Sequence, residues 1–269
     1  MKKTLLAIAA ISVFFGCEPE NNTPEEPEDV VSFPQNAIDL GLIITREDGT
    51  KYNLFWAECN IGANAPEEYG DYYAWGEVEA YYSSKNPFVW KKGKEAGYYW
   101  ASYKWGDVSA HKLTKYCPIK EEYFWDGGGA PDGKMVLDTG PKGDDVASRA
   151  LGGKWRMPTD AEFRALKNKC EYKWDTKNGV KGMYFTSKAE GNTNSIFLPA
   201  ALSLYETFLS DSVDPYGNDI TFGYYWSSTL DSAQSGCKLG IEKGAVTHGG
   251  IYRFIGASVR AVWAVEITE

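Results

Sequence analysis

Residues 151–163 read LGGKWRMPTDAEF, and the second half of this stretch marks the start of the clearest helix in the chain. Thr159 and Glu162 have the spacing of a capping box, in which the hydroxyl and the carboxylate each bind a backbone amide of the first turn. Apolar side chains then recur on one helical face, at Phe163, Leu166 and Cys170. The sequence therefore predicts a helix that begins after Thr159 and packs one face against a core.

A shorter helix is predicted just upstream, from Asp144 or Asp145 through Leu151, where Gly152 and Gly153 end it. Most of the remaining chain is typical of short strands separated by glycine-rich turns. We expect strands at 38–45, 53–57, 182–186, 195–198, 223–228, 236–242 and 258–267. Two helices packed on small antiparallel sheets, with long aromatic-rich loops, predict an α+β fold.

The start of the chain is typical of an export signal. Lys2 and Lys3 precede an apolar run over residues 5–15, which is too short to span a bilayer but has the length of a signal-peptide core. The run ends at Phe15-Gly16-Cys17, which resembles a bacterial lipobox. We therefore expect a signal peptide over 1–16 and acylation of Cys17, which would anchor the protein in the outer membrane or at the cell surface.

Residues 18–29 read EPENNTPEEPED and contain no large apolar side chain. Such a segment cannot bury enough surface to offset the entropy of ordering it, so residues 17–29 are interpreted as the lipidated cysteine and an acidic, proline-rich tether. No second linker or internal repeat follows. The sequence predicts a single domain over 30–269.

The composition narrows the function. The chain has 269 residues and a formal net charge of -9, which argues against a nucleic-acid binder, since such a protein needs a net basic surface. It has two histidines and none of the common catalytic or cofactor fingerprints. We expect a monomer that needs no cofactor and has no catalytic residues.

Seven sequence blocks, in this order, resemble the Fibrobacter major paralogous domain family, which is common in lipoproteins of gut Bacteroidetes. They are WAECNIGA (56–63), PEEYGDYYAWGE (66–77), LGGKWRMPTDAEF (151–163), NGVKG (178–182), NSIFLPAA (194–201), GYYWSST (223–229) and ASVRAVW (257–263). The resemblance covers roughly residues 37–265. It implies a C-type-lectin-like fold and an extracellular binding or adhesion module.

The segment from Tyr52 to Trp125 contains half of the forty aromatic residues of the chain. Within it, residues 81–120 contain eight lysines and only two acidic residues. Residues 78–101 look like an insertion beside the pattern of the family that the chain resembles. Long loops on a rigid scaffold are common places for binding sites. The candidate ligand-binding residues are Trp90, Lys91, Lys92, Tyr98, Tyr99, Trp100, Tyr103 and Trp105. Aromatic faces and lysines predict recognition of a glycan, including an acidic one; alternatively, these aromatics pack the long loops against the core.

Other functions remain open. A protein-interaction or fimbria-associated adhesin module, with a surface protein as partner, is the second hypothesis, and a glycoside hydrolase-like enzyme is the third.

An oxygen-rich stretch, DSVDPYGND, has loose calcium-ligand character through Asp211, Asp214, Asn218 and Asp219. It lacks the spacing of a known calcium loop, so a turn is favoured and no metal site is predicted.

Overall fold

The computed structural model describes residues 37–83, 89–90, 97–106, 112–205, 208–209 and 221–267. All of these ranges belong to one compact unit, Gln35–Glu269. Several predictions lie outside the described residues: the signal peptide, the acylated cysteine with its tether, and the candidates Lys91, Lys92, Asp211, Asp214, Asn218 and Asp219.

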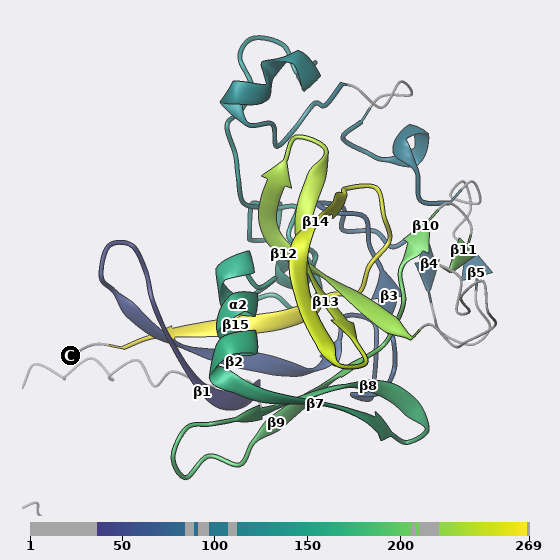
Figure 1. Cartoon of the computed structure of the whole chain (residues 1–269). Helices are drawn as coiled ribbons and strands as arrows, with labels where there is room; N and C mark the ends of the chain where they lie inside the picture. The colour runs from purple at the N-terminus through teal and green to yellow at the C-terminus, as the bar shows by residue number, and fades with distance from the viewer. Residues whose placement is uncertain are drawn as a thin grey trace, which may run out of the picture. The chain divides into compact units, whose positions relative to one another are not determined.

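Antiparallel sheets dominate the described chain (Figure 1). A four-stranded sheet has the order β1 (Ala37–Thr45), β2 (Lys51–Asn60), β15 (Arg260–Glu266) and β6 (Trp155–Arg156). Two three-stranded sheets are formed by β7 (Cys170–Lys177), β8 (Val180–Ser187) and β9 (Ser195–Pro199), and by β12 (Phe222–Ser232), β13 (Ser235–Glu242) and β14 (Ala245–Tyr252). Shorter strands pair as β3 (Asp71–Tyr72), β4 (Tyr82–Ser83) and β5 (Val89–Trp90), and as β10 (Leu204–Tyr205) and β11 (Phe208–Leu209).

The described helices are short. They are the 3₁₀ helices η1 (Trp100–Ser102) and η2 (Ile119–Phe124) and the α-helices α1 (Val146–Leu151) and α2 (Asp160–Lys169). None of these helices is long and apolar enough to cross a membrane.

Both predicted helices are confirmed, together with their caps. Thr159 Oγ1 accepts from the Glu162 amide at 3.2 Å, and Glu162 Oε2 accepts from the Thr159 amide at 2.8 Å, as a capping box requires. The side chain of Asp145 caps α1, and Gly152, with φ of 67°, ends it. However, α2 ends at Lys169, so Cys170 begins β7 instead of continuing the helical face.

The predicted α+β class is wrong, because the described chain is β-rich. The seven predicted strands overlap β1, β2, β8, β9, β12, β13 and β15, but eight further strands were not predicted. The longest of these are β7 and β14. Strand β7 is largely exposed and strand β14 contains two adjacent glycines, so neither has the regular apolar alternation that identifies a half-buried strand.

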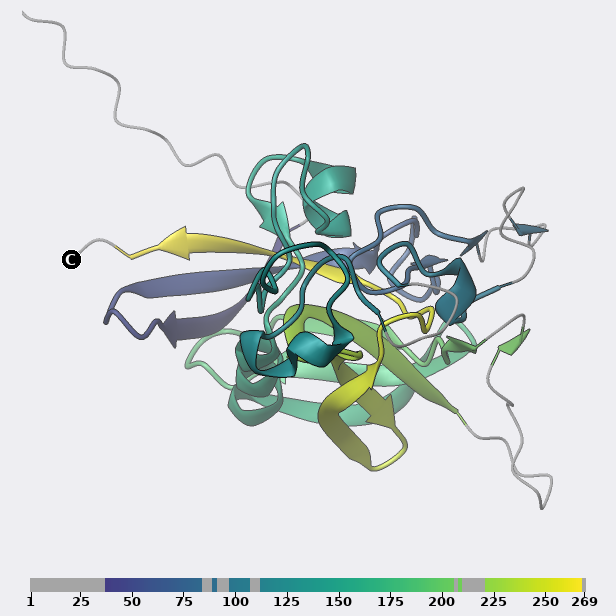
Figure 2. The same cartoon turned by 90° about the horizontal axis from the view of Figure 1, so that it is seen from above.

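The core lies between the sheets and around α2. Figure 2 shows β2 and β15 in one layer and the β12 to β14 sheet in another, and α2 packs against β1, β12 and β13. Strand β12 contributes to two core clusters from its two faces, because Tyr225 and Trp226 point in opposite directions and both are fully buried. At the start of this strand, Phe222 and Tyr224 leave their side chains partly exposed.

Two fully buried arginines join separate parts of the fold: Arg260 joins strands of two sheets, and Arg253 joins loops to the end of β14. Arg260 donates to Asn60 Oδ1 at 2.9 Å and to the Phe197 carbonyl at 3.0 Å. Arg253 Nε donates to Tyr103 Oη at 2.9 Å, and its other nitrogens donate to the carbonyl oxygens of Lys115, Tyr116 and Ala233. The guanidinium of Arg253 therefore fixes the aromatic-rich segment against the end of β14, as buried charges require hydrogen-bond partners.

Candidate binding surface

Two of the predicted ligand-binding residues belong to the core. Tyr98 is fully buried; its hydroxyl donates to the Tyr72 carbonyl and accepts from the Tyr81 amide at 3.0 Å, and its ring stacks on that of Tyr81 at 4.6 Å. Tyr103 is 3% exposed, and its hydroxyl donates to the Trp75 carbonyl at 2.7 Å. A ligand cannot reach either ring. At these two positions the aromatic side chains instead pack the long loops against the core, which was the alternative interpretation of the sequence.

Trp105 is partly exposed, but it is already engaged. Its Nε1 donates to the Gly76 carbonyl at 2.8 Å, and the ammonium groups of Lys104 and Lys115 lie 4.1 and 5.1 Å from its ring centroid. Cations at these distances interact with the face of an indole. Trp105 is therefore a poor platform for a ligand.

The lysines around Trp105 are also paired. Lys115 Nζ donates to Asp144 and lies 3.4 Å from Asp138, and Lys104 Nζ lies 3.9 Å from Asp144. Burial opposes the charge of Lys115, but its hydrogen bonds to Asp144 and Asp138 and the charges of those residues outweigh burial and raise its pKa. The acidic partners thus neutralise the part of the predicted basic segment that contains these two lysines.

Trp90 lies in β5, where its backbone pairs with that of Tyr82. Tyr99 is 36% exposed and precedes η1.

Trp100 lies at the centre of an aromatic cluster at the surface. Its ring centroid is 5.1 Å from that of Phe254 and 6.1 Å from that of Tyr252, and Tyr205 lies 5.7 Å from Phe254. Phe254 is buried at the base of this cluster, Trp100 is half-buried, and Tyr205 and Tyr252 are about half exposed, at 49% and 50%. These four residues, which come from η1, β10 and the end of β14, are called the aromatic platform below.

The backbone around the platform is held in place by specific contacts. Ser102 Oγ donates to the Gly97 carbonyl at 2.6 Å, which fixes η1 and hence Trp100. Arg253 lies between Tyr252 and Phe254 in sequence, and its buried guanidinium fixes the backbone that holds these two rings. A Cβ at Gly256 would lie 2.8 Å from the Tyr98 ring, so only glycine allows this segment to approach so closely. The platform is therefore preorganised.

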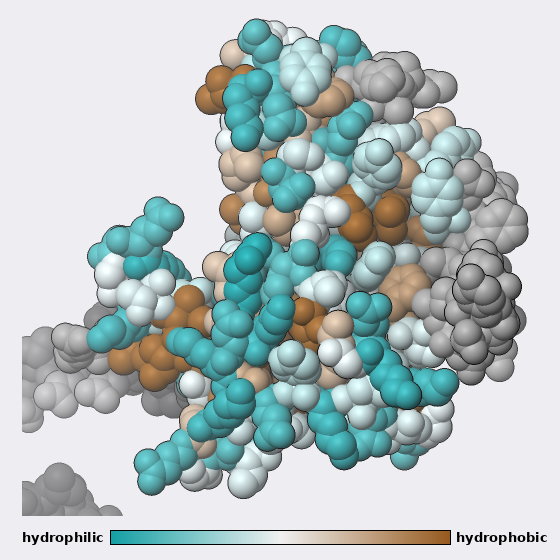
Figure 3. Space-filling view, viewed as in Figure 1, coloured by the Kyte–Doolittle hydropathy of each residue, from teal (hydrophilic) through white to brown (hydrophobic). Residues whose placement is uncertain are grey.

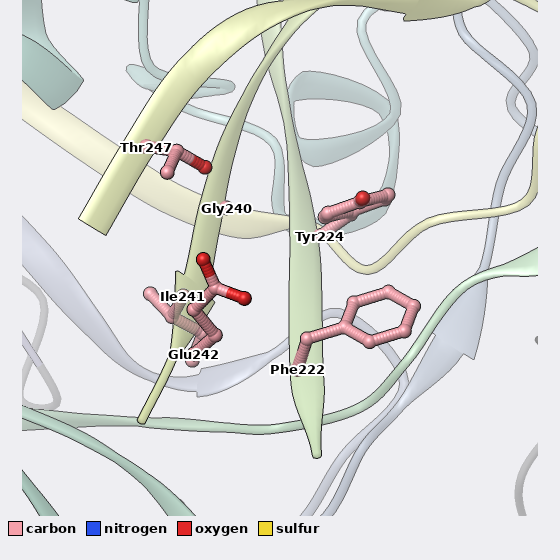
Figure 4. A pocket seen from close by; sticks show the side chains of 6 residues that line it. All are labelled: Phe222, Tyr224, Gly240, Ile241, Glu242 and Thr247. Atoms are coloured by element: carbon pink, nitrogen blue, oxygen red, sulfur yellow. The ribbon is translucent and has the colours of Figure 1, made fainter. Parts of the chain in front are cut away.

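A second feature is a pocket on the outer face of the sheet formed by β12, β13 and β14 (Figure 4). It has a volume of about 270 Å³. Phe222 and Tyr224 extend from β12 with ring centroids 4.7 Å apart, and the Glu242 carboxylate and Thr247 hydroxyl lie over the neighbouring strands. Gly240 and Ile241 complete the lining.

Lys238 does not itself line the pocket, but its ammonium group contacts two lining residues, Thr247 and Tyr224. The residue is 7% exposed; its Nζ donates to Thr247 Oγ1 at 3.2 Å and lies 4.5 Å from the centroid of the Tyr224 ring. No carboxylate among the described residues forms an ion pair with it. Burial lowers the pKa of Lys238, and the negative charge of Glu242 partly opposes this effect.

Gly240 makes room for this ammonium group. A Cβ at position 240 would lie 2.7 Å from Lys238 Nζ and 2.5 Å from Thr247 Oγ1. The lysine side chain therefore occupies space that any other residue at position 240 would need. The ammonium group of Lys238, the hydroxyl of Thr247 and the ring of Tyr224 therefore lie in contact.

The sequence did not single out Tyr205, Tyr252 or the pocket residues as a site. Tyr224 was noted only for the alternation in GYYWSST, which predicts that Tyr224 and Tyr225 face opposite sides of a strand. The three strands that line the pocket meet through hairpin registers, and position 247 lies in a strand that was not predicted. No sequence signal brings Lys238 and Thr247 together.

The described residues do not contain an activated nucleophile of the Cys-His type. Burial raises the pKa of the Cys237 thiol to about 12, which is opposite to the change that activates cysteine. His248 Nδ1 lies 3.6 Å from Asp160 Oδ1, and neither ring nitrogen has a hydrogen-bond partner in this part of the chain. Nor do His, Cys, Asp and Glu side chains cluster there in a way that would hold a metal ion.

Comparison with known proteins gives no relative: no family model, no curated protein and no solved structure matches the chain.

Proposed function

We propose that this chain is a non-catalytic glycan-binding module of an exported lipoprotein, and that the aromatic platform is its main contact surface. The observation that carries the proposal is the packing of Trp100 against Phe254 and Tyr252, which leaves Tyr252 half exposed on a fixed support. Acylation at Cys17 and placement in the outer membrane or at the cell surface remain predictions from the sequence.

Aromatic rings at a surface suit sugars for a physical reason. The electron-rich face of an indole or phenol attracts the polarised C–H groups of a pyranose, and the hydroxyl of an exposed tyrosine forms hydrogen bonds at the rim. Rings that are already packed lose little conformational freedom when a ligand binds. The contacts of Trp100 and Tyr252 with Phe254 supply this rigidity.

The two lysines beside Trp105 do not offer free charge to an acidic glycan, which favours a neutral one. Lys104 and Lys115 are paired with Asp144, so an acidic polymer would have to compete with that carboxylate. Binding by stacking depends weakly on ionic strength, whereas binding by free lysines weakens as salt screens the charges. We therefore expect affinity that changes little between low and high salt.

The test uses the purified chain from residue 18 to 269, a panel of neutral and acidic polysaccharides, and two salt concentrations. Trp100→Ala and Tyr252→Ala are expected to reduce binding at least tenfold. The matched control is Tyr123→Ala, because Tyr123 is 65% exposed but lies outside the platform on η2. Unchanged binding by both platform variants, or equal loss in the control, would contradict the proposal.

A protein-interaction module is the second candidate, and one observation favours it. Ile119 and Tyr123 lie on η2 and are 70% and 65% exposed. On the face seen in Figure 3, however, hydrophobic surface is divided into separate patches by hydrophilic residues, whereas stable protein interfaces need a continuous patch. Loss of a surface-protein partner by Ile119→Ser, with glycan binding unchanged, would support this second function.

A further inference from the structure

We infer that the pocket of β12, β13 and β14 binds a single uncharged pyranose ring, as a subsite distinct from the aromatic platform. This inference rests on the proposed glycan-binding function and adds to it a second site with a defined ligand class. The residues that carry it are Phe222, Tyr224, Lys238, Glu242 and Thr247.

The size of the pocket limits the ligand. A volume of about 270 Å³ lies just below the range of roughly 300–1,000 Å³ that is typical of small-molecule sites. The pocket therefore has room for about one sugar ring. The rings of Phe222 and Tyr224 offer an apolar wall to the C–H groups of such a ring.

The charges select an uncharged ligand. Glu242 lines the pocket with a carboxylate, and the ammonium group of Lys238 lies behind the lining residues Thr247 and Tyr224. A charged sugar would meet one like charge beside one opposite charge, so it would gain little net attraction while it lost the hydration of its own charge. Neutral hydroxyls accept from the ammonium and donate to the carboxylate. A polyol ring is the ligand class that meets all of these groups without an opposing charge.

The ammonium group is held ready for this role. Thr247 Oγ1 accepts one of the three donors of Lys238, and the Tyr224 ring lies against the group, so its position is set before a ligand arrives. Since the residue is buried and lacks an ion-pair partner among the described residues, a ligand hydroxyl would compensate part of its lost hydration. The missing side chain at Gly240 keeps this geometry open.

The inference is tested by titrating the isotope-labelled 18–269 chain with methyl glucoside, methyl galactoside, methyl mannoside, glucuronic acid and glucosamine, and following the amide resonances of Tyr224, Gly240 and Thr247. At least one neutral glycoside is expected to shift these resonances in a saturable way, and to bind at least tenfold more tightly than either charged sugar. Thr247→Val and Lys238→Met are expected to weaken this binding at least fivefold. Gly240→Ala is expected to abolish it by displacing the ammonium group.

Three comparisons decide the outcome. Far-UV circular dichroism shows which variants fold, and Thr247→Val, an exposed and nearly isosteric change, is the variant least able to disturb folding. Trp100→Ala should bind the neutral glycoside normally, which separates this subsite from the platform. The inference is overturned if no neutral glycoside shifts the pocket resonances or if charged sugars bind equally well, while loss of polysaccharide binding in Trp100→Ala would still support the proposed function.

Discussion

Tyr98 and Tyr252 have the same side chain in the same aromatic region of the molecule but different environments. Tyr98 is fully buried with its hydroxyl bonded to two backbone groups, whereas Tyr252 is 50% exposed and contacts its neighbours only through its ring. The difference shows that aromatic density alone does not mark a binding site. What separates these two tyrosines is that the hydroxyl of Tyr98 has backbone partners inside the protein, as a buried polar group requires.

The largest effect on stability is expected when Arg253 is replaced, because its guanidinium binds the buried Tyr103 and its backbone lies between the platform residues Tyr252 and Phe254. Arg253→Met leaves a phenol and three carbonyl oxygens without their buried donor. Because each orphaned acceptor costs free energy, we expect the free energy of unfolding in urea to fall by about 3–5 kcal/mol. Arg164→Met is the control, since Arg164 is 59% exposed and its helical ion pair is worth less than about 0.5 kcal/mol. Equal losses in the two variants would contradict this account of Arg253.

A smaller effect separates the two tyrosines directly. Tyr98→Phe leaves the Tyr72 carbonyl and the Tyr81 amide without this partner, so we expect the protein to lose roughly 1–3 kcal/mol of unfolding free energy. Tyr252→Phe removes a hydroxyl that faces water, and we expect a change within about 0.5 kcal/mol. Urea denaturation of both variants measures the difference. If the two values agree within error, internal hydrogen bonding does not distinguish the two positions.

The smallest effect on stability concerns His248, whose buried ring nitrogens have no hydrogen-bond partner among the described residues. Burial lowers the pKa of His248; the charge of Asp160 opposes this, and those of Arg164, Lys167 and Lys238 reinforce it. Because the folded pKa is below the unfolded value of about 6.5, the unfolded chain takes up a proton first as the pH falls. Stability should therefore decrease as the pH falls from about 6.5 through the folded pKa. His248→Gln should remove this part of the slope, which thermal unfolding at several pH values would detect; an unchanged slope would assign it to other groups.

Local signals in the sequence located elements whose determinants are close together in the chain. The capping box at Thr159 and Glu162 and the cap at Asp145 are examples, because each involves residues three apart. The two-residue strands such as β3 and β6 were missed, since they are defined by partners at least ten residues away and have no periodicity of their own. Together with the missed strands β7 and β14, they make the described chain β-rich, so the predicted fold class was wrong.

The candidate sites follow the same rule. Trp100 was predicted from aromatic density, but Tyr205 and Tyr252 lie more than a hundred residues further along the chain. Hydrophobicity and charge alone also could not distinguish the half-buried Trp100 from the buried Tyr103, whose hydroxyl reaches the Trp75 carbonyl. The pocket depends on Gly240 lying opposite Tyr224 and Thr247, and only the folded register places these three residues side by side.

The thiols of Cys59, Cys117, Cys170 and Cys237 are all free. Burial raises the pKa of each; those of Cys117 and Cys170 rise to about 11 and that of Cys237 to about 12, so these thiols stay protonated and react slowly with oxidants at neutral pH. No covalent cross-link among these four positions contributes to stability, so folding of the described part of the chain requires neither an oxidase nor a disulfide isomerase. Its stability should be the same in reducing and in oxidising surroundings.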